Sequence, residues 1–256
     1  MEQIPLTEFD PDRKALIEPD MLRVAKTDIK PPEHCVMPIY GSIIEKLMQE
    51  GRLEKIYELY TPLVPIGIYK MEHEGKSITV SHPGIGSAWA GAHLEELIAF
   101  GCRKFVACGS AGVLTPELKR GAIIIPVSAL RDEGTSYHYF PPSRTIDMDP
   151  EVVRKLELVL QKHDVEYKIG KTWTTDAFFR ETKEKIARRK TEGCITVEME
   201  CSAFLAVARF RNVTFGQYLS AADDISGDDW NPRYIEDRIS LREKIFWLSV
   251  EACLTL

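Results

Sequence analysis

The feature that most constrains this chain is an apolar run that leads into a glycine-rich segment, at residues 104–112. Residues 105–108 (Phe-Val-Ala-Cys) predict a buried strand, and residues 109–112 (Gly-Ser-Ala-Gly) predict a turn directly after it. In α/β proteins, ligands bind at the carboxyl ends of such strands, where glycine lets a ligand approach the backbone. A tight turn packed under a helix would give the same pattern, so the prediction of a site needs support from other segments.

The rest of the chain alternates between the patterns of strands and helices. Apolar runs predict strands at residues 64–70, 77–81, 122–127, 165–172, 194–197 and 213–221. Further patterns predict helices at residues 87–100, 150–163, 181–189, 199–209 and 239–254. Ser87 is the expected N-cap of the helix at 87–100, and Gly101 follows its expected end. This alternation predicts an α/β fold in which helices sandwich a mixed or mostly parallel sheet.

Composition and charge limit the class of protein. A chain of 256 residues with 44% apolar residues can bury a large core, and no repeat or linker divides it. We therefore expect one domain. The net charge of −6 argues against nucleic-acid binding. With no bilayer-length apolar segment and an acidic, proline-broken start, a cytoplasmic protein without a membrane partner is expected.

The cysteines and histidines indicate neither disulfides nor a metal site. The six cysteines form no C-x-x-C pair and lie mostly in apolar runs, which predicts reduced core thiols. The histidines lack metal-ligand spacing, so we expect no metal and no organic cofactor. The basic cluster at 188–190 is expected to be a solvated helix end.

Three further segments fit one active-site plan together with residues 109–112. They are residues 84–87 (Gly-Ile-Gly-Ser), 197–203 (Val-Glu-Met-Glu-Cys-Ser-Ala) and 220–224 (Ser-Ala-Ala-Asp-Asp). In this order and at these separations, the segments resemble the nucleoside phosphorylase superfamily, which includes purine nucleoside phosphorylases, uridine phosphorylases and nucleosidases. The resemblance runs from about Val36 to the C-terminus, and residues 131–139 are most similar to the uridine phosphorylases. It implies a single-domain α/β/α sandwich with a central mixed sheet at 36–256, preceded by an N-terminal extension at 1–35.

The resemblance also implies roles for individual residues. Asp223 corresponds to the acid that protonates the leaving base, a contribution of roughly 10²–10⁴ in rate. Glu200 would accept hydrogen bonds from the ribose hydroxyls. Helix capping or turn chemistry would also explain Asp223 and its neighbour Asp224, and the helix dipole would explain Glu198. The other implied residues are Met199 and Gly86 at the ribose, Phe178, Phe179, Val197 and Gly112 at the base, and Ser110 and Gly109 at the phosphate or water site.

Two departures from the family pattern concern the substrates. Uridine phosphorylases follow the base-stacking aromatic with a glutamine that reads the pyrimidine, whereas residues 180–182 here are Arg-Glu-Thr. The arginines that bind phosphate are replaced by Ile43 and Ala107, and the nearest match to a third, taken from a neighbouring subunit, is Tyr60. Each lost charged hydrogen bond should weaken phosphate binding by about 1.5–3 kcal/mol.

These departures leave three interpretations open. The anion site is rebuilt from other basic residues, such as Arg131, Arg180 or Arg233, and phosphate remains a co-substrate. Alternatively, water replaces phosphate and the chain is a nucleosidase. The third interpretation is a non-catalytic nucleoside-binding relative, against which the retention of both Asp223 and Glu200 argues.

Two segments remain to be placed by the structure. The polar loop at 227–232 is expected either to close over the base as a lid or to be a surface loop, and His138 is expected near the pocket. Relatives complete each active site with residues of a neighbouring subunit, which implies a homo-oligomer, either a dimer or a hexamer. The extension at 1–35 would then wrap the neighbour or cap the pocket.

Overall fold

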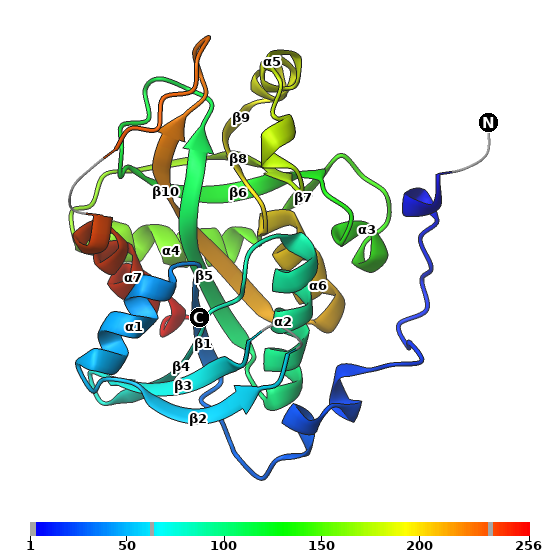
Figure 1. Cartoon of the computed structure of the whole chain (residues 1–256), viewed down its shortest axis with the longest axis vertical. Helices are drawn as coiled ribbons and strands as arrows, with labels where there is room; N and C mark the ends of the chain where they lie inside the picture. The colour runs from blue at the N-terminus through cyan, green and yellow to red at the C-terminus, as the bar shows by residue number, and fades with distance from the viewer. Residues whose placement is uncertain (1–3, 62–63, 235–237) are drawn as a thin grey trace.

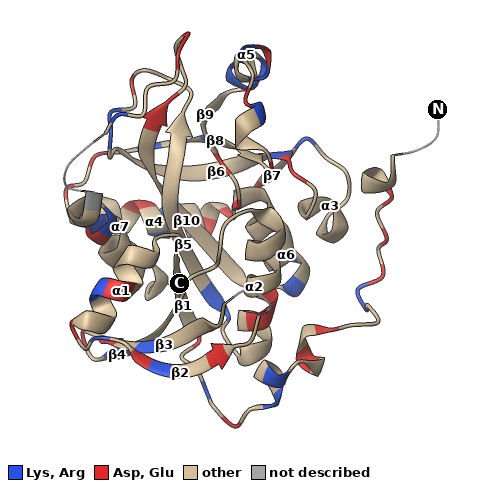
Figure 2. Ribbon diagram, viewed as in Figure 1, with Lys and Arg blue, Asp and Glu red and all other residues tan. Residues whose placement is uncertain are grey.

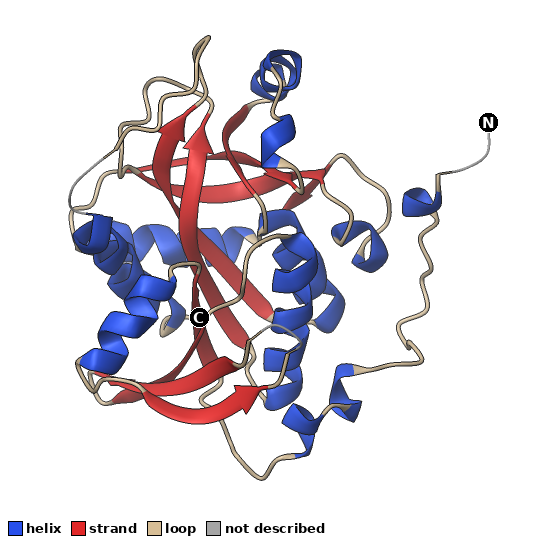
Figure 3. Cartoon of the chain, viewed as in Figure 1, coloured by secondary structure: helices blue, strands red, loops and turns tan. Residues whose placement is uncertain are grey.

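The computed structural model describes residues 4–61, 64–234 and 238–256, so residues 1–3 of the predicted extension lie outside the described part. The described strands form one ten-stranded mixed sheet, with helices on both of its faces (Figures 1 and 3). This arrangement confirms the predicted α/β architecture with a central mixed sheet.

The strands are β1 (His34–Pro38), β2 (Glu54–Leu59), β3 (Ile66–His73), β4 (Lys76–Ser81), β5 (Lys104–Val113), β6 (Ile123–Asp132), β7 (Thr145–Asp147), β8 (Tyr167–Thr175), β9 (Cys194–Glu198) and β10 (Thr214–Asp224). The α-helices are α1 (Gly41–Gln49), α2 (Ser87–Phe100), α3 (Ser136–Tyr139), α4 (Pro150–Lys162), α5 (Lys183–Thr191), α6 (Cys201–Arg211) and α7 (Arg238–Cys253). Short 3₁₀ turns are η1 (Pro5–Thr7), η2 (Pro19–Met21), η3 (Arg23–Lys26) and η4 (Phe178–Arg180).

The sheet closes on itself around one strand. Its order is β10-β6-β8-β9-β5-β1-β4-β3-β2, with β7 beside β6, and β10 also pairs with β5. The β5–β10 pair is parallel and places Ser220 beside Ser110, whereas β9 meets the end of β5 in antiparallel fashion at Gly112 and Val197. The ends of β5, β9 and β10 therefore meet at one edge of the ring.

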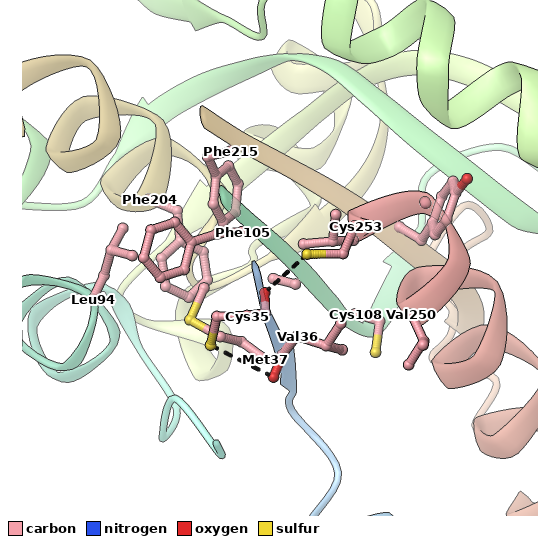
Figure 4. Close-up of a cluster of buried hydrophobic side chains, with 14 of the residues drawn as sticks. Cys35, Val36, Met37, Leu94, Phe105, Cys108, Phe204, Phe215, Val250 and Cys253 are labelled. Carbon is pink, nitrogen blue, oxygen red and sulfur yellow. Dashed lines mark hydrogen bonds between the residues drawn. The ribbon is translucent and has the colours of Figure 1, made fainter. Parts of the chain in front are cut away.

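The core lies between the sheet and two groups of helices. Helices α1, α4 and α7 pack on one side, and α2 and α6 pack together on the other (Figure 1). Figure 4 shows part of this core, where Phe105, Phe204 and Phe215 lie near Cys35 and Cys253. Each fully buried phenylalanine stabilises the fold by about 1.5–3 kcal/mol. All six cysteines are buried and free, as predicted.

The glycine-rich segment at 109–112 is a strand and not the predicted turn. Strand β5 continues through it to Val113, because β10 and β9 supply partners for its backbone. Its glycines serve close approach instead of bending. A Cβ added to Gly109 would lie 3.0 Å from Ile39 Cδ1, so the side chain of Ile39 occupies that space.

Several predicted boundaries shift for local reasons. Gly86, not Ser87, is the N-cap of α2, and the Ser87 hydroxyl donates instead to the Met199 carbonyl at 2.7 Å. Helix α5 begins after Thr182, whose side chain accepts from Lys185 N at 3.4 Å. Helix α6 begins at Cys201, later than predicted, and β1, α1 and β2 were not predicted at all.

The basic cluster at the end of α5 is only partly solvated. Figure 2 shows the Lys and Arg residues gathered on this helix. Arg189, however, is 6% exposed, pairs with Asp132 at 2.9 Å and with Glu192 at 3.1 Å, and lies over the Trp173 ring. The expectation of a fully solvated helix end was therefore wrong for Arg189.

The N-terminal extension runs along the outside of the domain (Figure 1). It is attached through the buried side chain of Val24 and an ion pair of 3.0 Å between Glu18 and Arg211. Between these attachments and η1, Leu16 and Ile17 are 97% and 79% exposed. None of the helices in the described ranges combines the length and apolar surface that crossing a bilayer requires.

Candidate active site

The residues predicted to bind ribose come together between β9 and α2. The Gly86 N–H donates to Glu200 Oε1 at 2.7 Å, and Ser87 Oγ donates to the Met199 carbonyl at 2.7 Å. Gly86 has a φ of +86°, which favours glycine because it has no Cβ. Burial raises the pKa of Glu200, while the Gly86 N–H favours its charged form. The bond from Gly86 fixes the Glu200 carboxylate, which is 5% exposed, at the N-terminus of α2.

Glu198 has a different task from Glu200. Its Oε2 accepts from the backbone N–H groups of Glu200 at 2.8 Å and Cys201 at 2.6 Å, and its Oε1 accepts from Thr174 Oγ1 at 2.6 Å. Burial and the neighbouring Glu200 raise the pKa of Glu198 to about 8. The side chain therefore caps the start of α6 and holds the turn that carries Glu200.

The residues predicted to contact the base meet where β5, β9 and β10 end. A Cβ added to Gly112 would lie 3.0 Å from Val197 Cγ1 and 3.6 Å from Asp223 Oδ1. The Trp230 indole, in the loop after β10, donates from Nε1 to Asp223 Oδ2 at 2.8 Å. The polar loop at 227–232 therefore contacts the predicted acid.

Asp224, the neighbour of Asp223, is a structural residue. Its Oδ1 accepts from Ser226 N at 2.8 Å, and its Oδ2 pairs with Arg233, which also donates to the Leu118 carbonyl at 2.6 Å. Burial favours a higher pKa for Asp224, but the bonds from Ser226 and Arg233 outweigh it and lower the pKa. Of the acidic pair, Asp223 is the one whose carboxylate lies beside Gly112 and accepts from Trp230.

Phe178 and Phe179 lie on η4, just beyond the end of β8. Their ring centroids are 4.0 Å apart, and the two side chains are 51% and 87% exposed. Glu181 follows them, and its pKa is raised to about 7 by burial and by the charge of Asp223. Electrostatics therefore couple η4 to the acid at the end of β10.

The region predicted to hold phosphate lacks the family's arginines. Ser110 is exposed on β5, and its hydroxyl donates to Tyr40 Oη at 3.3 Å. Ile43 and Ala107, at the arginine positions, are 1% and 0% exposed and pack in the core. Neither position can be reached by an anion.

Two of the three arginines predicted to rebuild the anion site are used elsewhere. Arg131 is 4% exposed and donates to Ser136 Oγ at 2.8 Å, to Ser143 Oγ at 2.7 Å and to the backbone carbonyls of residues 140 and 141. Arg233 is held by Asp224. These two assignments were wrong, whereas Arg180 is exposed on η4.

Four residues near the predicted site were missed from the sequence. Trp230 was included only as part of a polar loop, Glu181 only as a departure from uridine phosphorylases, and Tyr40 and Arg242 not at all. An aromatic residue inside a polar loop that closely follows the predicted acid was the available signal for Trp230. Nothing local marked Tyr40 or Arg242, because their partners lie far away in the sequence.

A cavity of about 610 Å³ lies elsewhere, between the extension and α2, α3 and α6. Its lining includes Arg13, Glu18, His93, His138 and Phe210. His138, expected near the nucleoside pocket, lines this cavity. No group of three His, Cys, Asp or Glu side chains in the described ranges is arranged to hold a metal ion.

The fold and this site define a class of protein. The structure of purine nucleoside phosphorylase from Toxoplasma gondii, in complex with immucillin-H, superposes with a TM-score of 0.75. The superposition covers 88% of this chain and 91% of that chain at 19% identity, so it establishes the shared fold. The sequence model of the phosphorylase superfamily matches residues 48–245. The chain therefore belongs to the phosphorylase superfamily.

Several nucleoside phosphorylases are similar to parts of the chain. Guanosine phosphorylase of Halorubrum lacusprofundi is 27% identical over 149 residues, 58% of this chain and 62% of the relative. A DeoD-type purine nucleoside phosphorylase of Exiguobacterium sibiricum is 24% identical over 60% of this chain and 66% of the relative. Uridine phosphorylase of Thermococcus kodakarensis is 35% identical over 42% of this chain and 39% of the relative. The chain spans less than two thirds of each, and all three relatives are named as phosphorylases.

Proposed function

We propose that this chain is a purine nucleoside phosphorylase, which cleaves the N-glycosidic bond with phosphate as the second substrate. The observation that carries the proposal is the placement of two carboxylates, Asp223 on β10 and Glu200 just after β9, on two strands that both pair with the end of β5. Asp223 lies against Gly112 and Val197. Met199 and Glu200 follow Val197 two and three residues later in the sequence. We place the base of the nucleoside at Asp223 and its ribose at Glu200.

The proposed reaction assigns one task to Glu200, at the ribose, and another to Asp223, at the base. Glu200 accepts hydrogen bonds from ribose hydroxyls and fixes the sugar. A phosphate oxygen forms a bond to C1′ as the bond from C1′ to the base nitrogen breaks, and the electron pair of that bond moves to the base. Asp223 delivers a proton to the base nitrogen, and the phosphate's proton is the net source of that proton. The products are the free base and a pentose 1-phosphate.

A purine is proposed because the pyrimidine-reading glutamine of uridine phosphorylases is absent. At this place the chain has Glu181, a carboxyl group that is electrostatically coupled to Asp223. A carboxylate can accept from the N–H groups on the edge of a 6-oxopurine, whereas two acidic groups offer little to the carbonyls of uracil. The likeness to guanosine phosphorylase agrees with this choice.

A nucleoside panel tests the proposal. Guanosine, inosine, adenosine and uridine would be incubated with the protein, with and without phosphate, and base and sugar products separated by chromatography. The proposal requires a pentose 1-phosphate from at least one purine nucleoside and slower or no turnover of uridine. Turnover of uridine alone would contradict the purine assignment.

Hydrolysis is the second candidate, favoured by one specific observation. Both arginine positions, Ile43 and Ala107, are buried in the core, and the side chain of Ile39 covers Gly109. A nucleosidase would release free ribose at the same rate in phosphate-free buffer. The same chromatography separates free ribose from the phosphorylated sugar.

We also propose a homo-oligomer in the cytoplasm. Leu16 and Ile17 of the extension, and Tyr60 at the position of the neighbour's arginine in relatives, are 97%, 79% and 89% exposed. A second copy of the chain would cover these side chains. Light scattering at micromolar concentration tests the assembly, and a monomer with full activity would exclude it. Cell fractionation tests the compartment.

A further inference from the structure

A chain of three hydroxyl groups lies at the place where the family's arginines are missing. The Ser110 hydroxyl donates to Tyr40 Oη at 3.3 Å, and Tyr40 Oη is 3.1 Å from Ser220 Oγ. Ser110 and Ser220 are register partners on the parallel strands β5 and β10, so both project toward Tyr40. Burial raises the pKa of Tyr40 to about 12, which keeps this hydroxyl protonated and able to donate.

A positively charged side chain of the C-terminal helix lies beside these three hydroxyl groups. The Arg242 guanidinium of α7 lies 5.0 Å from the centre of the Tyr40 ring and donates from Nη1 to Ser42 Oγ at 2.9 Å. Ser42 lies in the first turn of α1, where backbone N–H groups add to the positive potential.

Arg242 differs from the cations around it in having neutral partners. Within the described residues it forms no ion pair with a carboxylate, whereas Lys46, on the same α1–α7 interface, pairs with Glu243 at 2.5 Å. Arg233 is likewise neutralised by Asp224. A partly buried guanidinium held by a hydroxyl and a ring keeps N–H donors and charge for an anion.

We propose that Arg242 and the Ser110–Tyr40–Ser220 hydroxyls form the oxyanion site of this chain, and that its ligand is inorganic phosphate. The inference rests on the proposed function and deepens it, because it supplies the charge that Ile43 and Ala107 cannot. When phosphate binds, the exposed Ser110 hydroxyl turns its single proton from Tyr40 to a phosphate oxygen and accepts from the Tyr40 hydroxyl instead. Tyr40 is a positioning residue that orients the Ser110 hydroxyl. Arg242, which lies over the face of the Tyr40 ring, supplies the positive charge.

Three substitutions test the site through phosphate kinetics. Arg242→Gln is expected to raise the phosphate KM roughly tenfold or more and to leave the nucleoside KM within about twofold. Tyr40→Phe should raise the phosphate KM less, roughly three- to tenfold, because it removes only the hydroxyl that orients Ser110. Arg242→Lys keeps the charge without the planar fork and should fall between wild type and Arg242→Gln.

Matched controls separate this effect from general destabilisation. Arg52 lies 4.2 Å from the centre of the Trp247 ring, away from β5, so Arg52→Gln removes the same charge and the same kind of ring contact. Tyr218→Phe removes a buried hydroxyl that donates to the Leu156 carbonyl at 2.6 Å. Both controls should keep the wild-type phosphate KM. If Arg242→Gln does not fold, Arg242→Lys and Tyr40→Phe decide the question.

Calorimetry with inorganic phosphate alone keeps this inference separate from the proposed function. Wild type should bind phosphate, and Arg242→Gln should bind it at least tenfold more weakly, whether or not a nucleoside is cleaved. A phosphate affinity unchanged in Arg242→Gln, or base release at one rate with and without phosphate, would overturn the oxyanion site. Phosphate binding by a protein that cleaves no nucleoside would instead overturn the proposed function and leave the site intact.

Discussion

The two ends of the proposed nucleoside site are built in opposite ways. At the ribose end, Glu200 and Glu198 are 5% and 6% exposed, and backbone N–H groups fix both carboxylates. At the base end, Phe178, Phe179 and Trp230 are 51%, 87% and 62% exposed, on short turns and loops. The ribose end is thus formed before ligand binds, whereas the base end has apolar surface that only a ligand would cover. Substitutions at the ribose end should therefore remove hydrogen bonds from a fixed carboxylate, whereas substitutions at the base end should change proton delivery or base stacking with little loss of stability.

The largest effect should come from Asp223→Asn, at the base end. We expect kcat for purine nucleosides to fall by roughly 10²-fold or more, because the amide cannot deliver a proton to the leaving base. The melting temperature should change little, since the Trp230 N–H can still donate to an amide oxygen. Steady-state kinetics and thermal melting measure both quantities. A variant as active as wild type would show that Asp223 is structural.

The ribose end should respond next, through Glu200→Gln. This change should lower kcat/KM by roughly tenfold or more and should cost more than Glu200→Asp, since an amide offers one acceptor oxygen where a carboxylate offers two. Glu95→Gln is the control, because Glu95 is a buried carboxylate that pairs with Arg211 outside the cleft. If Glu200→Gln and Glu95→Gln behave alike in kinetics, Glu200 does not hold the ribose.

Substitutions of the two aromatic residues of η4 should have smaller effects, and they distinguish which ring stacks on the base. Phe178→Ala should raise the nucleoside KM roughly three- to tenfold, because its half-buried ring is in place to stack on a planar base. Phe179→Ala should change it less than about twofold, since that ring is 87% exposed and rests on Phe178. The comparison needs only initial rates over a range of nucleoside concentrations. A larger effect at Phe179 would reverse the assignment of the stacking ring.

The smallest effect concerns pH and Glu181. The pKa of Glu181 is raised to about 7 from the ordinary value of 4.5, so the folded chain keeps a proton there that the unfolded chain has lost. Stability contributed by this group is therefore present below about pH 4.5 and is lost as the pH rises through 7. Glu181→Gln should consequently gain melting temperature relative to wild type between pH 5 and 8.

Glu184→Gln is the matched control for this pH effect. Glu184 is an exposed residue in the first turn of α5, so the change removes a nearby charge that is in solvent. Melting curves at pH 5, 6, 7 and 8 should show the rising difference only for Glu181→Gln. Parallel curves for wild type and Glu181→Gln would contradict the burial of this carboxyl group.

The parts of the site that the sequence predicted depend on short-range signals. Asp223 ends an apolar strand, and Glu200 lies between a strand and a helix, so their places follow from local pattern once the family is recognised. Glu198 was explained as a helix-dipole residue, and it does serve the start of α6, although from the end of β9.

The parts that were missed depend on partners distant in sequence. The segment at 109–112 was predicted to turn because glycine is common in turns, but β10, about a hundred residues later, pairs with it as a strand. Arg131 and Arg233 were predicted to bind an anion because a sequence shows charge and not what neutralises it. Arg131 proved to be enclosed by hydroxyl and carbonyl oxygens, and Arg233 by Asp224.

The six buried cysteines allow opening of the folded state to be measured by thiol labelling. Burial raises the pKa of the Cys108 thiol to about 12 and that of the Cys194 thiol to about 11. The reactive thiolate of these residues is therefore scarce in the folded state. A thiol reagent can reach Cys35, Cys108 and Cys253 only after the packing shown in Figure 4 has opened, and it can reach Cys194 only after the separate cluster around Trp173 has opened. The rate of labelling, followed by mass spectrometry, therefore measures how often the core opens. Whether labelling is all-or-none across the six sites shows whether the two helical layers separate together.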